Sequence, residues 1–193
     1  GQPTVHTKWN LNTGILSGDA MLILAYQYFE RYEPIIFRQL AEIFSKTALE
    51  VCEGQQYDVD FEKEEQVSTS QYLKMITYKT AVLVGAALKM GAIIAETSEE
   101  NKQKIYDFGI ALGIAYQLQD DYLDTFGDNT FGKKIGGDIL QNKKTLLYLN
   151  TLEKGSSEEK EALMRLYKFP IENEKIVKVT QLFISTGSDL FLR

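Results

Sequence analysis

Hydrophobic positions follow a helical pattern in two long segments of the chain. The segment from Tyr72 to Ala95 is apolar around most of its circumference, and small residues such as Gly85 and Gly91 alternate with its larger side chains. A helix that is apolar on all sides is typical of a position among other helices, and small residues let those neighbours approach closely. The segment from Asn101 to Asp124 has the same character. We therefore expect two core helices, both buried.

The remaining segments also favour helices. Proline, which breaks helices most reliably, occurs three times, and no alternating apolar and polar segment is flanked by hairpin turns. Apolar spacing predicts further helices over residues 16–30, 34–53, 139–153, 157–168 and 172–185. The polar stretch Gly54–Val67 is expected to be a connector, and the Gly- and Asp-rich stretch Phe126–Asp138 the main loop. The predicted fold class is all-α, in a single helical domain.

Composition and charge narrow the classes of function. A chain of 193 residues, 44% of them hydrophobic, is long enough to bury one core. Its net charge of -6 argues against nucleic acid as the main partner, because phosphate backbones favour a basic surface. The single cysteine, Cys52, is typical of a reducing compartment. No apolar run approaches the roughly 18 residues that span a bilayer, so we expect a cytoplasmic protein without an integral membrane segment.

Four polar residues gather at the C-terminal end of the second core helix. Gln117, Asp120, Asp121 and Asp124 are spaced so that they share one helix face. Carboxylates crowded in this way repel each other, and the helix dipole disfavours anions at this end. Oxygen ligands without a nearby His or Cys fit magnesium. The pattern alone leaves two interpretations open, a magnesium site and a solvated acidic helix end.

Lysines accompany this acidic cluster at three places in the chain: Lys133 with Lys134, Lys143 with Lys144, and Lys79 with Thr80. Ammonium groups beside a divalent metal suit a diphosphate ligand, whose oxygens can contact both. Taken singly, most of these lysines are typical of solvated surface charges. Lys79 differs because it lies within an apolar helix, so burial of its ammonium group would require an anionic partner.

Six segments of the chain, in this order and spacing, resemble the isoprenyl diphosphate synthase family of trans-prenyltransferases: GQPTVHTKW, GILSGDAML, EGQQYD, YLKMITYKTA, GIAYQLQDDYLD and FGKKIGGDILQNKKT. The resemblance implies an isoprenoid-synthase-type helical bundle over residues 1–193. It also implies an enzyme that condenses an allylic diphosphate with isopentenyl diphosphate in the trans configuration. Magnesium assists ionisation of the allylic diphosphate in this family, and the family's habit implies a homodimer.

The resemblance also assigns metal-site residues. GIAYQLQDDYLD is similar to the family's second aspartate-rich motif, which implies that Asp120 is a direct magnesium ligand. Asp121 and Asp124 would act through waters or as further ligands. Gln117 matches the glutamine of the same helix.

The diphosphate-binding residues follow in the same way. Lys79 and Thr80 match the family's Lys-Thr pair, which holds the allylic diphosphate. Lys133 and Lys143 are the expected equivalents of two downstream lysines that contact diphosphate, and Lys134 is an alternative to Lys133.

The sequence also departs from the family pattern. The family carries its first aspartate-rich motif directly upstream of the GQPTVH segment, whereas this chain begins at Gly1, and the C-terminal STGSDLFLR is short. We therefore expect a domain that is incomplete at its N-terminus and shortened at its C-terminus. Two alternatives follow: a non-catalytic subunit or inactive fragment of such a synthase, and a class I terpene cyclase. The second metal motif of a cyclase would mix Asn, Ser or Thr with Glu, whereas this motif is all aspartate.

Two residues of the EGQQYD segment stay undecided at this point. Gln55 and Asp58 match a Gln-x-x-Asp pattern of the family. A hydrogen-bond network at a helix end and a contact with the ligand are both compatible with it.

Overall fold

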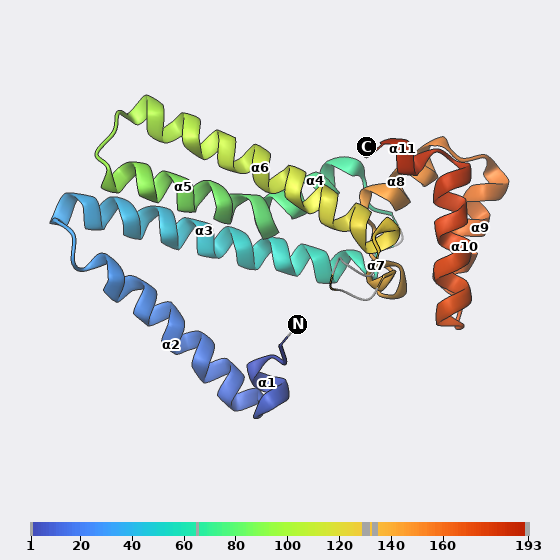
Figure 1. Cartoon of the computed structure of the whole chain (residues 1–193), viewed down its shortest axis with the longest axis horizontal. Coiled ribbons are helices and arrows are strands. Elements are labelled where there is room, and N and C mark those ends of the chain that lie inside the picture. Colours follow the sequence, from blue (N-terminus) through green and yellow to red (C-terminus); the bar gives the residue numbers. More distant parts are fainter. Residues whose placement is uncertain (1, 65, 129–131, 133–134, 192–193) are drawn as a thin grey trace.

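Three long helical runs lie side by side and form the main layer of the molecule (Figure 1). The first is α3 (Pro34–Phe61), which begins with proline at a position where the missing N–H costs nothing. The second run comprises α4 (Thr69–Ile76), the π-helical segment η1 (Thr77–Ala81) and α5 (Val82–Ile94). The third is α6 (Glu99–Phe126), whose side-chain cap, Ser98, accepts a hydrogen bond from a backbone N–H of the first turn.

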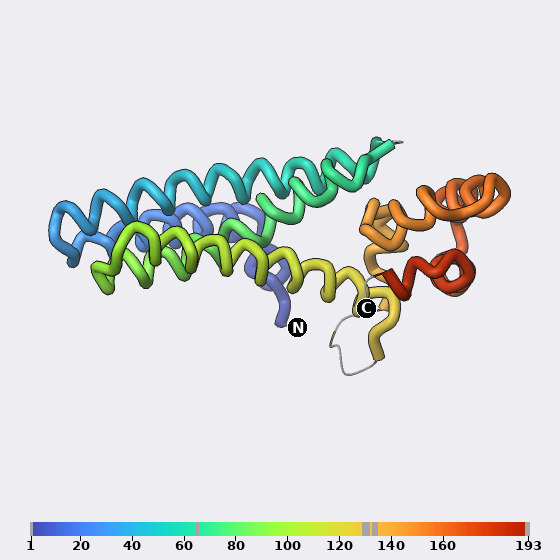
Figure 2. The backbone as a smooth tube through the Cα atoms, turned by 90° about the horizontal axis from the view of Figure 1, so that it is seen from above, coloured from blue at the N-terminus to red at the C-terminus, as the bar shows by residue number. Residues whose placement is uncertain are grey.

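Shorter helices flank this layer at both ends of the chain. They are α1 (Val5–Lys8), α2 (Leu11–Phe29), α7 (Gly137–Leu140), α8 (Leu146–Lys154), α9 (Ser157–Tyr167), α10 (Glu172–Ser185) and α11 (Ser188–Phe191). Helix α2 diverges from α3 in Figure 1, and Figure 2 shows α8 to α11 gathered at one end of the long helices. The computed structural model describes the whole chain except residues 1, 65, 129–131, 133–134 and 192–193. The described residues contain no strand, so the all-α prediction is confirmed.

Glycines set the spacing between the long helices. A Cβ atom added at Gly54 of α3 would overlap the backbone of Tyr78 and Lys79 in η1. A Cβ at Gly109 or Gly113 of α6 would come within 2.5 Å of a backbone atom of the second run. Because glycine leaves that space open, the backbones of the three runs approach closely, and η1 is held between α3 and α6.

The main hydrophobic core joins α4 to the C-terminal helices. Tyr72 and Ile76 of α4 are almost completely buried, as are Leu147 of α8, Leu163 of α9 and Phe183 of α10. These side chains belong to one cluster. The core therefore fixes the C-terminal helices against the end of the long layer where α4 meets α6.

Two helix boundaries differ from the prediction. The expected connector Gly54–Val67 is wrong over its first half, because α3 continues to Phe61. Gly54 and Asp58 are buried in this part of α3, so contacts with η1 stabilise a polar helical turn that apolar spacing could not detect. The expected helix over 139–153 is also wrong, because residues 141–145 separate α7 from α8.

Burial of the second core helix was also predicted incorrectly. Phe108, Leu112 and Tyr116 of α6 are exposed, because no described segment covers that side of the helix. The run Thr69–Ile94 is long and apolar enough to cross a membrane by length and composition. This run is longer than the apolar runs that the sequence analysis identified, and the absence of an integral membrane segment stays a prediction. A core helix of a soluble protein passes the same test, and this run packs against α3 and α6.

Candidate functional site

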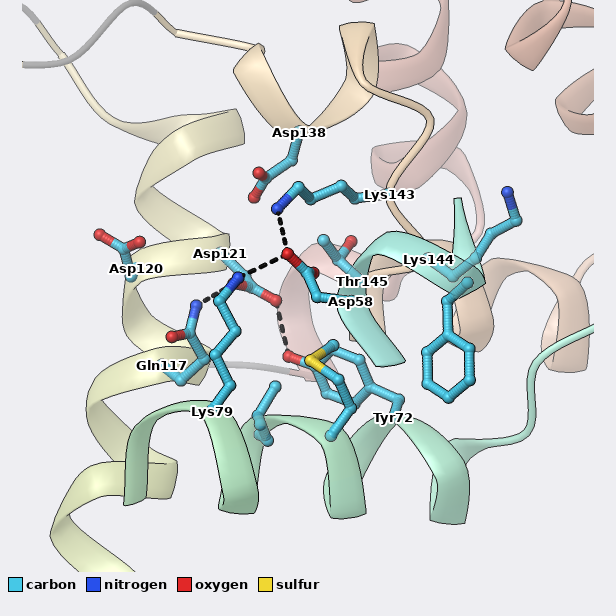
Figure 3. A pocket seen from close by; sticks show the side chains of 13 residues that line it. Asp58, Tyr72, Lys79, Gln117, Asp120, Asp121, Asp138, Lys143, Lys144 and Thr145 are labelled. Atoms are coloured by element: carbon cyan, nitrogen blue, oxygen red, sulfur yellow. Dashed lines mark hydrogen bonds and ion pairs between the residues drawn. The ribbon is translucent and has the colours of Figure 1, made fainter. Parts of the chain in front are cut away.

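A polar pocket of about 270 Å³ lies where the long helices meet the C-terminal helices (Figure 3). Its walls come from α3, α4, η1, α6, α7 and the loop before α8. The lining residues are Asp58, Phe61, Tyr72, Met75, Ile76, Lys79, Gln117, Asp120, Asp121, Asp138, Lys143, Lys144 and Thr145. Charged groups of both signs and a small apolar floor therefore share one cavity.

Asp58 pairs with two lysines that come from distant parts of the chain. Its Oδ2 accepts hydrogen bonds from Lys79 Nζ at 2.6 Å and from Lys143 Nζ at 2.9 Å (Figure 3). Burial raises the pKa of Asp58. The hydrogen bonds and charges of the two lysines together lower it by more than burial raises it, so the pKa lies below its usual value. Asp58 is therefore an anion that holds two ammonium groups side by side.

The position of Lys79 follows from helix packing. Lys79 lies in η1, whose backbone packs against Gly54, one turn before Asp58 on α3. This close approach brings the Lys79 side chain to Asp58. The requirement that a lysine in this helix has an anionic partner is met by Asp58 itself.

A second polar chain crosses from η1 to α6. Thr80 Oγ1 donates to Gln117 Oε1 at 2.8 Å, and Gln117 Nε2 donates to Asp121 Oδ1 at 2.8 Å. The Tyr72 hydroxyl donates to the other oxygen, Asp121 Oδ2, at 2.6 Å. Burial raises the pKa of Asp121 to about 6, although the hydrogen bonds from Tyr72 and Gln117 lower it. Both Asp121 oxygens are therefore engaged by side chains of the protein.

The three aspartates of the acidic cluster face different surroundings. Asp120 lines the pocket. Asp124 is buried, and its Oδ1 accepts the backbone N–H of Asp138 at 2.9 Å, which ties α6 to α7. Burial raises the pKa of Asp138 to about 7, and repulsion by Asp124 and Asp121 adds to this rise.

The sequence-predicted residues assemble in part. Lys79, Gln117, Asp120, Asp121 and Lys143 line one pocket. Thr80 reaches this pocket through its hydrogen bond to Gln117, while Asp124 binds α7 instead. Lys133 and its alternative Lys134 lie outside the described residues.

Several lining residues were missed or left undecided by the sequence analysis. Asp58 was left between two roles, and the structure makes it the partner of both lysines. Tyr72 and Asp138 were not singled out as site residues. A signal for Asp58 was present in the Gln-x-x-Asp spacing, whereas a buried tyrosine looks like an ordinary core residue in sequence.

The oxygen donors of the pocket determine how a divalent cation could bind there. Within the described parts of the chain, no group of three or more His, Cys, Asp or Glu side chains is gathered closely enough to hold a metal ion by itself. Asp120 lies at the pocket wall and offers carboxylate oxygens, while Asp121 lies beside it. Magnesium typically keeps several waters and takes one or two carboxylates together with substrate phosphates. The residues therefore fit a magnesium ion held by Asp120, water and a phosphorylated ligand.

Comparisons with known proteins agree on one family. A family model described as polyprenyl synthetase matches residues 1–183. The geranylgeranyl diphosphate synthase of Methanosarcina mazei is 39% identical over 158 residues, which cover 80% of this chain and 49% of that protein. The geranylfarnesyl diphosphate synthase of Natronomonas pharaonis is 37% identical over 158 residues, which cover 80% of this chain and 46% of that protein.

Solved structures give the same result for the fold. A crystal structure titled geranylgeranyl pyrophosphate synthase superposes with a TM-score of 0.94 at 52% identity, over 99% of this chain and 60% of that one. The geranylgeranyl pyrophosphate synthetase from Pyrococcus horikoshii gives a TM-score of 0.90 at 33% identity, over 100% and 59%. The chain spans about half the length of the curated relatives it matches.

Proposed function

Because this chain belongs to the polyprenyl synthetase family, we propose that its pocket binds the diphosphate group of an allylic substrate. The proposed reaction condenses that substrate with isopentenyl diphosphate in the trans configuration and lengthens the prenyl chain. The relatives named as geranylgeranyl and geranylfarnesyl diphosphate synthases support this class of reaction.

One observation carries the proposal. Two lysine ammonium groups converge on a single carboxylate oxygen of Asp58, and carboxylates of α6 line the same pocket. A diphosphate needs cations on more than one side, because its charge is spread over several oxygens. Lys79 and Lys143 would supply direct hydrogen bonds on one side, and Asp120 would supply a metal ligand on the other.

The donor chemistry supports a magnesium requirement. Asp120 would be the direct ligand, and Asp121 would act through water because its oxygens already accept hydrogen bonds from Tyr72 and Gln117. Asp124 would act by holding α6 against α7 rather than as a ligand. When bound, magnesium neutralises charge that develops on a departing diphosphate.

The chain's own residues have separate roles in this proposal. Lys79 and Lys143 bind and orient the diphosphate and stabilise it as it departs. Thr80 and Gln117 keep the Asp121 carboxylate in place through their hydrogen bonds. Phe61 forms part of the apolar floor beside the charged groups, which reduces access of water to a reactive allylic cation.

The binding step can be tested by calorimetric titration of the chain with inorganic pyrophosphate, with and without magnesium. We expect magnesium-dependent binding that Asp120→Asn and Lys79→Met each weaken by about tenfold or more, since each removes a charged contact. Asp107→Asn is a matched control, because Asp107 is exposed on the same helix and accepts a hydrogen bond from Gln103. Pyrophosphate binding that ignores magnesium and both substitutions would contradict the proposal.

The reaction itself can be tested with radiolabelled isopentenyl diphosphate. With the intact protein, we expect label to enter an acid-labile lipid product when dimethylallyl, geranyl or farnesyl diphosphate is supplied with magnesium. Absence of incorporation with all three substrates would contradict the proposed activity.

Two further proposals concern the surroundings of the protein. We propose a homodimer, which the exposed apolar side chains of α2 support. We also propose a cytoplasmic location, which the lone thiol of Cys52 supports because oxidising compartments favour paired cysteines.

A further inference from the structure

A buried lysine lies between α10 and the loop that precedes α8. The residue Lys175 is 4% exposed. Its Nζ donates to Asn142 Oδ1 at 2.6 Å and to the backbone oxygen of Tyr167 at 3.0 Å. Both acceptors are neutral, and within the described part of the chain no ion pair includes Lys175. Burial lowers the pKa of Lys175, because its charge is separated from water.

The loop that Lys175 contacts carries one of the pocket lysines. Asn142 has a φ of 59°, in the left-handed region that asparagine tolerates better than most residues. In the next residue, the backbone N–H of Lys143 donates to the backbone oxygen of Asp138 at 2.9 Å. The backbone oxygen of Lys143 accepts the hydroxyl of Tyr167 at 3.2 Å. Both the backbone N–H and the backbone oxygen of Lys143 are therefore hydrogen-bonded, and Lys175 binds the preceding residue, Asn142.

We propose that Lys175 is a positioning residue for the pocket: by binding Asn142 and Tyr167, it fixes the loop so that Lys143 reaches Asp58 and the diphosphate. The inference rests on the proposed function, because it assigns Lys175 an indirect role in the same ligand site. Lys175 itself does not line the pocket described above.

The energetic balance supports a positioning role. A buried ammonium group without a carboxylate partner costs stability, and an apolar side chain of similar length would fill the same space at lower cost. Its positive charge also acts on the neighbouring lysine: burial lowers the pKa of Lys144, and repulsion by Lys175 lowers it further. Lys175 instead fixes the position of the loop, because its Nζ donates both to the side chain of Asn142 and to the backbone oxygen of Tyr167 at the end of α9.

A packing role is the alternative. The Nζ of Lys175 lies 5.4 Å from the centre of the Tyr167 ring, so its side chain also covers that ring. Methionine has nearly the same length and keeps this coverage while removing the donors. Lys175→Met therefore separates the hydrogen bonds from the packing. Lys178→Met is the matched control, because Lys178 lies one turn further on the same helix, is exposed and pairs with Glu174.

The first measurement needs no enzymatic activity. Amide hydrogen exchange, followed by mass spectrometry, reports how often the segment 141–145 opens. Loss of hydrogen bonds from a charged donor should speed exchange in this segment by about tenfold or more in Lys175→Met. Lys178→Met should leave the exchange rate of this segment as in the wild type. Unchanged exchange in Lys175→Met would overturn the proposal.

Two variants of Asn142 cover the case in which Lys175→Met does not fold. Asn142→Gly removes the acceptor but tolerates the positive φ, so it should speed exchange of the same segment. Asn142→Asp keeps an oxygen for Lys175, so it should exchange as slowly as the wild type. Exchange that is equally fast in both variants would also overturn the proposal, because the acceptor would then have no effect.

The second measurement asks whether Lys175 acts through Lys143. Pyrophosphate binding with magnesium is measured for Lys175→Met, Lys143→Met and the double variant. We expect Lys175→Met to weaken binding several-fold in the wild-type background and to have no further effect once Lys143 is replaced. Additive effects in the double variant would contradict action through Lys143.

A wild-type chain that does not bind pyrophosphate would contradict the proposed function. The hydrogen-exchange measurement would then decide by itself whether Lys175 anchors the loop.

Discussion

At the scale of single residues, one oxygen of Asp58 holds two lysines that lie 64 residues apart in the sequence. Removing the negative charge leaves these ammonium groups close together with no anion between them. We therefore expect Asp58→Asn to lower the free energy of unfolding by about 2 to 3 kcal/mol, since breaking one side of a buried ion pair is costly and partial exposure of the lysines reduces that cost. Urea unfolding measures this change.

Asp60→Asn provides the control for this substitution. Asp60 is exposed on the same helix and accepts a hydrogen bond from Gln56 at 2.8 Å. Its replacement should change the free energy of unfolding by no more than about 0.5 kcal/mol. Equal effects of the two substitutions would show that the ion pairs of Asp58 contribute little.

The same residue gives the stability a defined pH dependence. The pKa of Asp58 in the folded chain lies below the usual value of 3.8. A carboxyl group with a lowered folded pKa stabilises the fold above its unfolded pKa, and this contribution is lost as the pH falls through the folded pKa. The stability difference between wild type and Asp58→Asn should therefore be constant from pH 7 to about pH 5 and shrink below about pH 4. Urea unfolding over a pH series measures it, and a difference that grows on acidification would contradict the assignment.

At the scale of elements, the contact between α3 and η1 depends on the missing side chain of Gly54. An added Cβ would overlap the backbone of η1, which has no flexible atom to move aside. We expect Gly54→Ala to lower the free energy of unfolding by about 1 to 3 kcal/mol, the usual range for overpacking. It should also weaken pyrophosphate binding, because Lys79 lies at this contact.

Gly91→Ala tests the same change where space is available. A Cβ at Gly91 of α5 meets nothing within 4 Å. Alanine is the better helix former, so this variant should be more stable by about 0.5 to 1 kcal/mol. Effects of the same sign at both glycines would refute the packing argument.

Helix periodicity explains which elements could be predicted from sequence. Apolar spacing identified the helices over 34–53, 72–95 and 101–124. It missed the last turns of α3, because those turns are polar on most faces and are stabilised by Gly54 and Asp58 in contact with η1. It also missed the break at residues 141–145, which depends on the long-range contacts of Asn142 and Lys143. Local patterns contain no information on contacts of this kind.

At the scale of the whole molecule, the packing of the helices determines which candidate residues lie in the same pocket. The spacing of Asp120, Asp121 and Asp124 predicts one shared helix face, but only Asp120 and Asp121 line the pocket, whereas Asp124 accepts the backbone N–H of Asp138 in α7. The pairing of Asp58 with Lys143 joins segments 85 residues apart, and no helical period relates them. The family resemblance predicts that Lys79 and Lys143 bind a diphosphate. The fold shows in addition that both lysines pair with Asp58.

At the same scale, one face of the molecule is unusually apolar. Helix α2 has no buried residue, and Figure 1 shows it diverging from the long helices. Large apolar side chains are exposed along its length: Leu11, Ile15, Leu16, Met21, Leu22, Ile23, Leu24 and Tyr28. An apolar surface of this extent is typical of an interface between proteins. The homodimer that the family resemblance implies therefore has a candidate interface in the exposed apolar side chains of α2.

We therefore expect α2 to contribute to the contact between two copies of the chain. Leu16 and Ile23 are 67% and 60% exposed and lie two turns apart on one face of α2. Sedimentation equilibrium at micromolar concentration should give twice the mass of one chain for the wild type. Replacing both residues with glutamate should give the mass of one chain, because burying two carboxylates in an apolar interface is strongly unfavourable. Val177→Glu is the control, since Val177 is an exposed apolar residue on α10, and this variant should remain a dimer. A wild-type chain that sediments as a monomer would refute the dimer, and a dimer that survives both glutamates would place the interface on another surface.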